Sequence, residues 1–290
     1  MQFLVAQLAF FLTTTLLYVY LSRAHSKSLA FNATLLFLYF PFSFSLSQFR
    51  PEAFLILFSV LSLYLASCGR LWDSALAAAV AGLAKPNAFL LSILLLGHYP
   101  GVPRLEPRHP VESLKAIWRA TPSAFSWKGL VMLAAPAAGI VFMSLHLHNL
   151  TGDYLAWAKI QAAWGGKFGY GAWDAVHQLI TRPMVVGRGG WDPTLLHWGV
   201  FGVFIVAITG LFWQRMYLFA LYAVLYTAMT FSNFGVIVLG KHLSTCFPVF
   251  VGISVLARNR QVLMAMVIFG AALLSLNGLF NGMNLDFTRP

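Results

Sequence analysis

The chain has 290 residues, of which 59% are apolar and only 9% are charged. A soluble domain carries about a quarter charged residues, so this composition excludes an ordinary soluble protein and indicates one that lies largely in lipid. The formal net charge is +11, but no compact Lys/Arg stripe with interleaved aromatic residues indicates a nucleic-acid partner. Basic residues instead hold membrane loops on the cytoplasmic side and meet anionic lipid head groups.

The apolar runs predict an all-α fold, a polytopic transmembrane helical bundle that forms one integral-membrane domain over residues 1–290. A single helix over 74–99 is the alternative to two short ones, but Pro86 removes a backbone donor and disfavours helix at Lys85. The expected spans are 3–22, 29–47, 53–68, 74–84, 88–99, 129–148, 195–213, 216–238, 244–257 and 261–281.

Charge bias sets the orientation of these spans. The connection 100–128 carries five basic and two acidic residues, so the positive-inside rule places it in the cytoplasm. The connection 149–194 then faces the lumen or periplasm. Its Trp and Tyr residues favour the head-group level, and we expect short interfacial helices in it. The first of these is predicted over 151–164, with Thr151 as its N-cap.

Charged groups near the ends of apolar spans are candidate functional residues, because ionisable groups are costly near lipid. Four such groups fall on the predicted outer face: Arg50-Pro51-Glu52, Lys85-Pro86-Asn87, His146 to Asp153 and Lys241-His242. Glu52 is either a helix-start carboxylate paired to Arg50 or a carboxylate that binds sugar hydroxyls or acts as a general base.

The two lysines each have a structural and a functional interpretation. Lys85 is either a snorkelling side chain at a helix break or a cation that meets a lipid-linked phosphate. Lys241-His242 is either a basic cap at a helix C-terminus or a second phosphate contact.

No metal or cofactor is expected. His146 and His148 are two residues apart and do not share a helix face, and no third ligand has a useful spacing. Cys68 and Cys246 give no metal pattern and no disulfide framework. The sequence has no Walker loop, no GxSxG and no dinucleotide glycine pattern, so nothing indicates ATP, a covalent serine or a nicotinamide. Asn149-Leu150-Thr151 fits the glycan sequon, which matters only in a eukaryotic secretory membrane.

Taken in chain order, these groups resemble the PIG-V family, the mannosyltransferases that add the second mannose to GPI anchors, and its bacterial relatives. The resembling stretches are Asn32 to Tyr64, Ala77 to Asn87 (AAAVAGLAKPN), His148 to Gly165 (HNLTGDYLAWAKIQAAWG) and Gly240 to Phe250 (GKHLSTCFPVF). Lysine replaces the family's arginine at Lys85 and Lys241, and Tyr154 replaces its proline.

The resemblance implies a C-type glycosyltransferase fold and an inverting hexosyltransferase that takes mannose from a dolichyl- or polyprenyl-phosphate donor and passes it to a glycolipid or glycan acceptor. Because the lipid phosphate is the leaving group, no nucleotide is needed. Glu52 would bind or deprotonate the acceptor. The substrate- and phosphate-binding residues would be Arg50, Lys85, Asn87, His148, Asp153, Gln161, Trp164, Lys241 and His242. The membrane would be the endoplasmic reticulum in a eukaryote and the inner membrane in a bacterium.

Family members carry a key acidic residue in a first outer loop, whereas no acidic residue precedes Glu52 here. We therefore expect the chain to correspond to the family without its N-terminal helix and first outer loop. Three explanations remain open: a fragment, an enzyme that needs a partner subunit, and a non-catalytic membrane subunit or transporter that binds a lipid-linked sugar.

Overall fold

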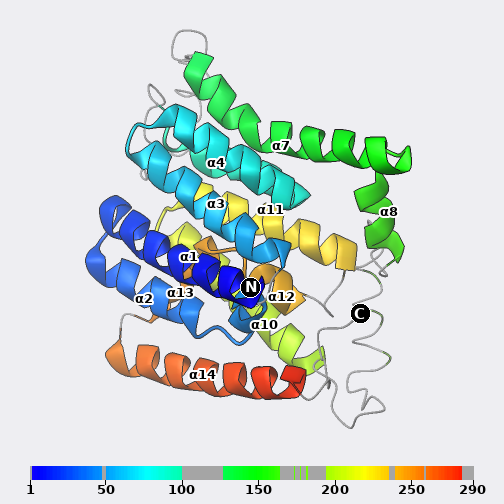
Figure 1. Ribbon diagram of the computed structural model, residues 1–290. Coiled ribbons are helices and arrows are strands. Elements are labelled where there is room, and N and C mark those ends of the chain that lie inside the picture. The colour runs from blue at the N-terminus through cyan, green and yellow to red at the C-terminus, as the bar shows by residue number, and fades with distance from the viewer. Residues whose placement is uncertain are drawn as a thin grey trace.

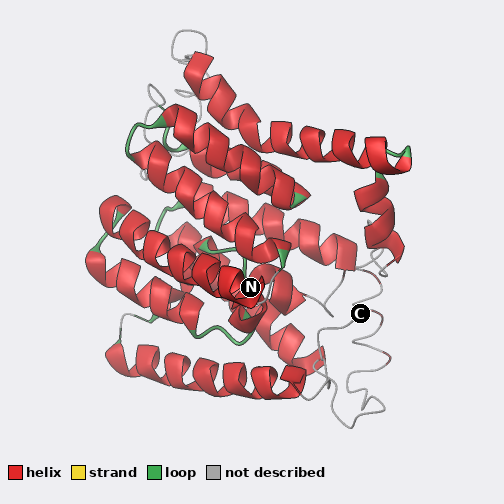
Figure 2. Cartoon of the chain, viewed as in Figure 1, coloured by secondary structure: helices red, strands yellow, loops and turns green. Residues whose placement is uncertain are grey.

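The computed structural model describes residues 2–47, 50–99, 127–163, 173, 177, 181, 194–234, 239–257 and 259–282. Within these residues the fold is all-helical, as expected, with no strand (Figures 1 and 2). The α-helices are α1 (Gln2–Ala24), α2 (Lys27–Leu38), α3 (Pro51–Ser67), α4 (Leu71–Ala84), α5 (Leu91–Leu96), α7 (Trp127–Thr151), α8 (Ala156–Ala163), α10 (Thr194–Trp213), α11 (Tyr217–Phe234), α12 (Leu239–Leu243), α13 (Pro248–Leu256) and α14 (Arg260–Gly282). Two 3-10 helices, η1 (Ser43–Ser47) and η2 (Pro86–Leu90), accompany them.

Two of the described helices are long and apolar enough to cross a membrane by length and composition, Leu4–Ala24 and Trp127–Thr151. Several shorter apolar helices lie beside them. Three predicted spans are shorter or divided. The span 29–47 is α2 followed by a turn and η1. The span 88–99 contains the end of η2 and then α5, and the span 244–257 contains the shorter α13.

The expected helix break at Lys85 is present. Helix α4 ends at Ala84, Lys85 has the extended dihedrals φ −156° and ψ 143°, and Pro86 begins η2. A proline ring disfavours the helical conformation in the residue before it, which explains why the break falls on the lysine. The Lys85 side chain therefore leaves the helix at a bend rather than from the middle of a regular span.

Helices α3, α4 and α7 pack closely because small and hydroxyl side chains line their contacts. The Ser62 and Ser74 hydroxyls each donate to the other's backbone carbonyl at 2.9 Å, which joins α3 to α4. A Cβ added to Gly82 would lie 2.1 Å from the Pro136 carbonyl oxygen, and one added to Gly139 would lie 2.0 Å from the Ala79 oxygen. Small residues allow this backbone approach, as in helix pairs within membranes.

The core surrounds α13, whose residues Pro248 to Ser254 are all buried. Phe250 meets Phe37 and Phe40 edge to face, at centroid distances of 5.4 and 5.2 Å. Offset and edge-to-face aromatic pairs stabilise such contacts beyond the area that they bury. This aromatic packing holds α2, α13 and the segment before η1 together.

The start of α3, the end of α4, the end of α7 and α12 all lie toward the same side of the bundle (Figure 1). The turns between α1 and α2, between α3 and α4, and between α10 and α11 lie at the opposite side. The four groups of candidate residues are thus brought to one side, from segments far apart in the sequence.

Candidate functional site

Glu52 lies in the first turn of α3 and is 4% exposed. Pro51 occupies the first helical position, where its missing N–H costs nothing and its fixed φ suits the helix. A carboxylate in the first turn also interacts favourably with the helix dipole. Arg50 is the N-cap residue of α3 and is partly exposed, and its side chain makes no capping hydrogen bond.

Lys85 reaches Glu52 across 33 residues of sequence. Its Nζ donates to Glu52 Oε1 at 2.8 Å, with the two side chains only 14% and 5% exposed. The carboxylate is therefore bonded to the lysine at the α4 break. A buried ion pair is sustained only where its geometry is good and further hydrogen bonds satisfy its remaining polar atoms.

His242 on α12 supplies such a contact. Lys85 Nζ lies 3.3 Å from His242 Nδ1, and the histidine is 8% exposed. Because an ammonium can only donate, Nδ1 accepts this bond and carries no proton. The imidazole is then the neutral tautomer with its proton on Nε2, so His242 acts as a hydrogen-bond donor and not as a second cation.

A layer of neutral polar groups surrounds the ion pair. Asn87 on η2 hydrogen-bonds to Tyr226 on α11. The Tyr226 hydroxyl also bonds to the Thr245 hydroxyl, which donates to the His242 backbone carbonyl at 2.6 Å. We call Glu52, Lys85, Asn87, His242, Tyr226 and Thr245 the polar cluster.

Sequence reasoning anticipated four of these six residues and missed Tyr226 and Thr245. A signal for Tyr226 exists in its helix, because Tyr226, Thr227 and Thr230 place three hydroxyl groups on one side of a largely apolar helix. Thr245 follows the short α12 and had no distinguishing pattern.

His148 and Asp153 belong to a second group at the corner between α7 and α8. Gly152, at φ +74°, ends α7, and its N–H bonds to the His148 carbonyl at 2.7 Å. The His148 ring stacks on Tyr154 with centroids 3.8 Å apart. The Lys159 ammonium, 2.6 Å from Oδ2, and the Leu155 N–H hold the pKa of Asp153 below its usual value, so the carboxylate stays ionised at neutral pH.

One prediction about this corner is wrong. Thr151 does not cap the following helix but is the last residue of α7, and its hydroxyl donates to the Leu147 carbonyl at 2.8 Å. Helix α8 begins at Ala156, after the turn in which Asp153 accepts the Leu155 N–H. Because the left-handed Gly152 ends α7 only after Thr151, this threonine belongs to the last turn of α7 and cannot be the N-cap of α8.

Three predicted site residues lie wholly or partly outside the described residues. Trp164 falls in such a stretch, and for Gln161 and Lys241 only the backbone, in α8 and α12, is described. Among the described residues, no group of three or more His, Cys, Asp or Glu side chains is close enough to hold a metal ion.

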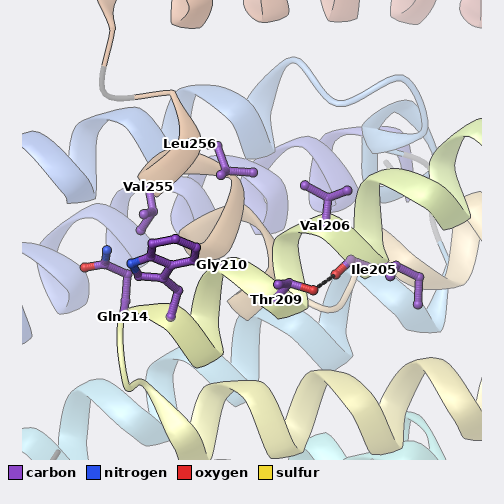
Figure 3. Close-up of a pocket in the computed structure, with 8 residues that line it drawn as sticks. Ile205, Val206, Thr209, Gly210, Gln214, Val255 and Leu256 are labelled. Atoms are coloured by element: carbon purple, nitrogen blue, oxygen red, sulfur yellow. Dashed lines mark hydrogen bonds between the residues drawn. The ribbon is translucent and has the colours of Figure 1, made fainter.

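A separate cavity of about 400 Å³ lies between α10 and α13, lined mainly by apolar side chains (Figure 3). The Thr209 hydroxyl beside it donates to the Ile205 carbonyl of its own helix at 2.9 Å. Gly210 and Gly252 let the backbones of α10 and α13 approach each other closely. It shares no lining residue with the polar cluster and offers little to a polar substrate.

The polar cluster is thus a buried arrangement of one carboxylate, one ammonium and one neutral imidazole, joined to an amide and two hydroxyls. Such a set can bind hydroxyl and phosphate oxygens, and its carboxylate can accept a proton from a bound hydroxyl. Comparison of the chain with protein-family models, with curated proteins and with solved structures finds no match in any of the three.

Proposed function

We propose that the chain is a polytopic membrane glycosyltransferase that transfers a mannose-like sugar from a polyprenyl- or dolichyl-phosphate donor to a lipid-linked or glycan acceptor on the lumenal or periplasmic face. The observation that carries the proposal is the buried contact of Glu52, Lys85 and His242, which come from α3, the α4 break and α12. A chain with so few charges gathers three polar groups in one place, where burial is costly.

The placement in a membrane is supported by the outer surface of the helices. Leu4, Phe11, Leu76, Phe142 and Phe269 are each between 64% and 70% exposed and lie on α1, α4, α7 and α14. Large exposed apolar surfaces are rare on soluble proteins, whereas lipid tails accommodate them. The end of α1, the α3–α4 and α10–α11 turns and the start of α14 lie at the side opposite the start of α3 and α12 (Figure 1). These segments carry the basic residues Arg23, Arg70, Arg215 and Arg260, and the positive-inside rule assigns such a side to the cytoplasm.

The roles in transfer follow from the hydrogen-bonding capacity of each group. Lys85 uses two of its three N–H groups on Glu52 and His242, and the third would meet an oxygen of the donor phosphate. Glu52 would take the proton of the acceptor hydroxyl as that oxygen attacks the sugar C1. The C1–O bond to the phosphate breaks with inversion, and the lipid phosphate leaves with the bonding electrons. Asn87 and His242 Nε2–H would hold sugar or phosphate oxygens.

A second function is supported by the same ion pair. The Glu52 carboxylate is already bonded to an ammonium, so it must exchange this partner for the acceptor hydroxyl before it can take a proton. A stable Glu52–Lys85 pair suits a non-catalytic subunit that binds a lipid-linked sugar. Binding without transfer separates this function from the enzyme.

Transfer is tested with the purified protein in lipid vesicles, supplied with radiolabelled dolichyl-phosphate mannose and candidate mannolipid acceptors. The enzyme predicts label in the acceptor, and a binding subunit predicts retained donor without labelled acceptor. Failure to bind dolichyl-phosphate mannose or polyprenyl-phosphate mannose would contradict both.

A further inference from the structure

Two buried threonine hydroxyls on α11 have no hydrogen-bond partner. Thr227 is 4% exposed and Thr230 is 1% exposed, and the Oγ1 atom of each is fully buried and unsatisfied. An unsatisfied buried hydroxyl costs free energy that a partner would recover. Groups of this kind in a helix next to a candidate site require an explanation.

Five other helical threonines in the described part of the chain make a bond within their own helix, whereas the Thr34 hydroxyl on α2 is, like those of the α11 pair, buried without a partner. Thr13, Thr14 and Thr15 on α1 each donate to the carbonyl four residues earlier. Thr151 and Thr209 do the same on α7 and α10. A helical threonine divides between two rotamers, one of which makes this bond. Thr227 and Thr230 give up a bond that their helix could supply.

The position of Thr230 relates it to the polar cluster. It follows Tyr226 by four residues on α11, so the two side chains are neighbours on one helix face. Tyr226 points toward Asn87 and Thr245. The Thr230 hydroxyl therefore lies one turn further along the same face, toward the end of α11 that precedes α12, and Thr227 lies on the adjoining side.

We propose that Thr230, with Thr227 beside it, binds an oxygen atom of the polar head of the lipid-linked donor. The inference rests on the proposed function and adds α11 to the substrate-binding elements. A hydroxyl can donate to a phosphate oxygen or a sugar oxygen, and both atoms belong to the same head group. Thr230 is a binding residue in this assignment and takes no part in proton transfer.

The test replaces Thr230 by valine, which has nearly the same shape without the hydroxyl, and compares Thr13→Val as the control. Thr13 is also fully buried in a helix, but its hydroxyl bonds to the Ala9 carbonyl.

Binding of dolichyl-phosphate mannose and of dolichyl phosphate to the purified proteins is measured, together with thermal unfolding of the ligand-free proteins. Thr230→Val is expected to bind about tenfold more weakly, the change that one lost hydrogen bond gives. Thr13→Val should bind as the wild type does.

The two lipids identify the atom that Thr230 contacts. Weaker binding of both lipids assigns the contact to the phosphate, and weaker binding of dolichyl-phosphate mannose alone assigns it to the sugar. Ligand-free Thr230→Val should unfold at the wild-type temperature or above, since a buried unsatisfied hydroxyl has been removed, and Thr230→Ser should keep normal binding.

Unchanged binding by Thr230→Val would overturn the inference and leave the proposed function intact. A marked fall in the unfolding temperature of ligand-free Thr230→Val would also overturn it, because the hydroxyl would then serve the fold. If the wild-type protein binds neither lipid, the proposed function fails, and this inference fails with it.

Discussion

The proposed chemistry depends on the Glu52 carboxylate and on its partner, Lys85. The carboxylate is almost completely buried, and Lys85 holds it at 2.8 Å. Both residues were predicted from the sequence as candidate functional residues, because each is a charged group at the end of an apolar span. The sequence could not show that they meet, since 33 residues and the bend at Lys85 separate them. His148 and Asp153 were also predicted as site residues from the sequence. Their contacts with Tyr154 and Lys159 lie at the α7–α8 corner, outside the polar cluster.

Replacing Glu52 by glutamine should lower sugar transfer well over tenfold. The amide keeps the size of the side chain but cannot accept the acceptor's proton, and a lost acid–base group typically lowers rates by about 100- to 10,000-fold. The measurement is transfer from radiolabelled dolichyl-phosphate mannose in vesicles. Asp73→Asn is the control, because Asp73 is an exposed carboxylate paired with Arg70 at the opposite side. Normal transfer by Glu52→Gln would remove Glu52 from the mechanism.

The ion pair also predicts that a variant lacking only Glu52 is less stable than a variant lacking both charges. Glu52→Leu alone leaves the Lys85 ammonium buried without its counter-charge, which should cost about 3–5 kcal/mol. Adding Lys85→Met removes that charge, so the double variant should recover most of the loss. Unfolding in detergent micelles by increasing sodium dodecyl sulfate measures all three proteins. A double variant as unstable as Glu52→Leu would show that the pair does not behave as a buried charge pair.

At the scale of elements, close backbone contacts and one helix break position the polar cluster. The break was predictable because proline acts on its immediate neighbour, a local effect. The division of 29–47 into α2 and η1 was not predictable from apolar length, because hydrophobicity does not distinguish a regular helix from a buried turn. The participation of α11 depends on tertiary contacts of Tyr226 with Asn87 and Thr245, which no local pattern encodes.

The contact between α4 and α7 should not tolerate a side chain at Gly82. A Cβ there would lie 2.1 Å from the Pro136 carbonyl oxygen, which belongs to rigid backbone. Gly82→Ala should therefore separate the helices, lower the unfolding temperature and displace Lys85, three residues later. Gly202→Ala is the control, since nothing lies within 4 Å of its added Cβ and alanine favours helix. Equal unfolding temperatures for both variants would contradict this packing.

The proposed function requires the two sides of the bundle to face different compartments. Composition alone indicated lipid, and charge bias alone indicated which loops face the cytoplasm. Neither could show that the polar groups converge, because convergence is a property of the folded bundle. In the described residues, the order of the helices brings the start of α3, the ends of α4 and α7, and α12 to one side (Figure 1).

The orientation can be measured with single cysteines in a Cys68→Ser/Cys246→Ser background. Asn149→Cys at the exposed end of α7 should react with a membrane-impermeant maleimide from the lumenal or periplasmic side. Ser26→Cys, in the exposed turn between α1 and α2, should react only from the cytoplasmic side. Labelling of both positions from one side in sealed membranes would contradict the proposed topology.

In the proposed function, Glu52, Lys85 and His242 form one site that holds the head of a lipid-linked sugar. The most direct measurement is photo-crosslinking of the wild-type protein with dolichyl-phosphate mannose that carries a diazirine on the sugar, followed by mass-spectrometric mapping of the modified peptides. The account predicts adducts on the segments that contain Glu52, Lys85 to Asn87 and His242, which excess unlabelled dolichyl-phosphate mannose suppresses. Adducts confined to other segments, or adducts that the unlabelled lipid does not suppress, would contradict it.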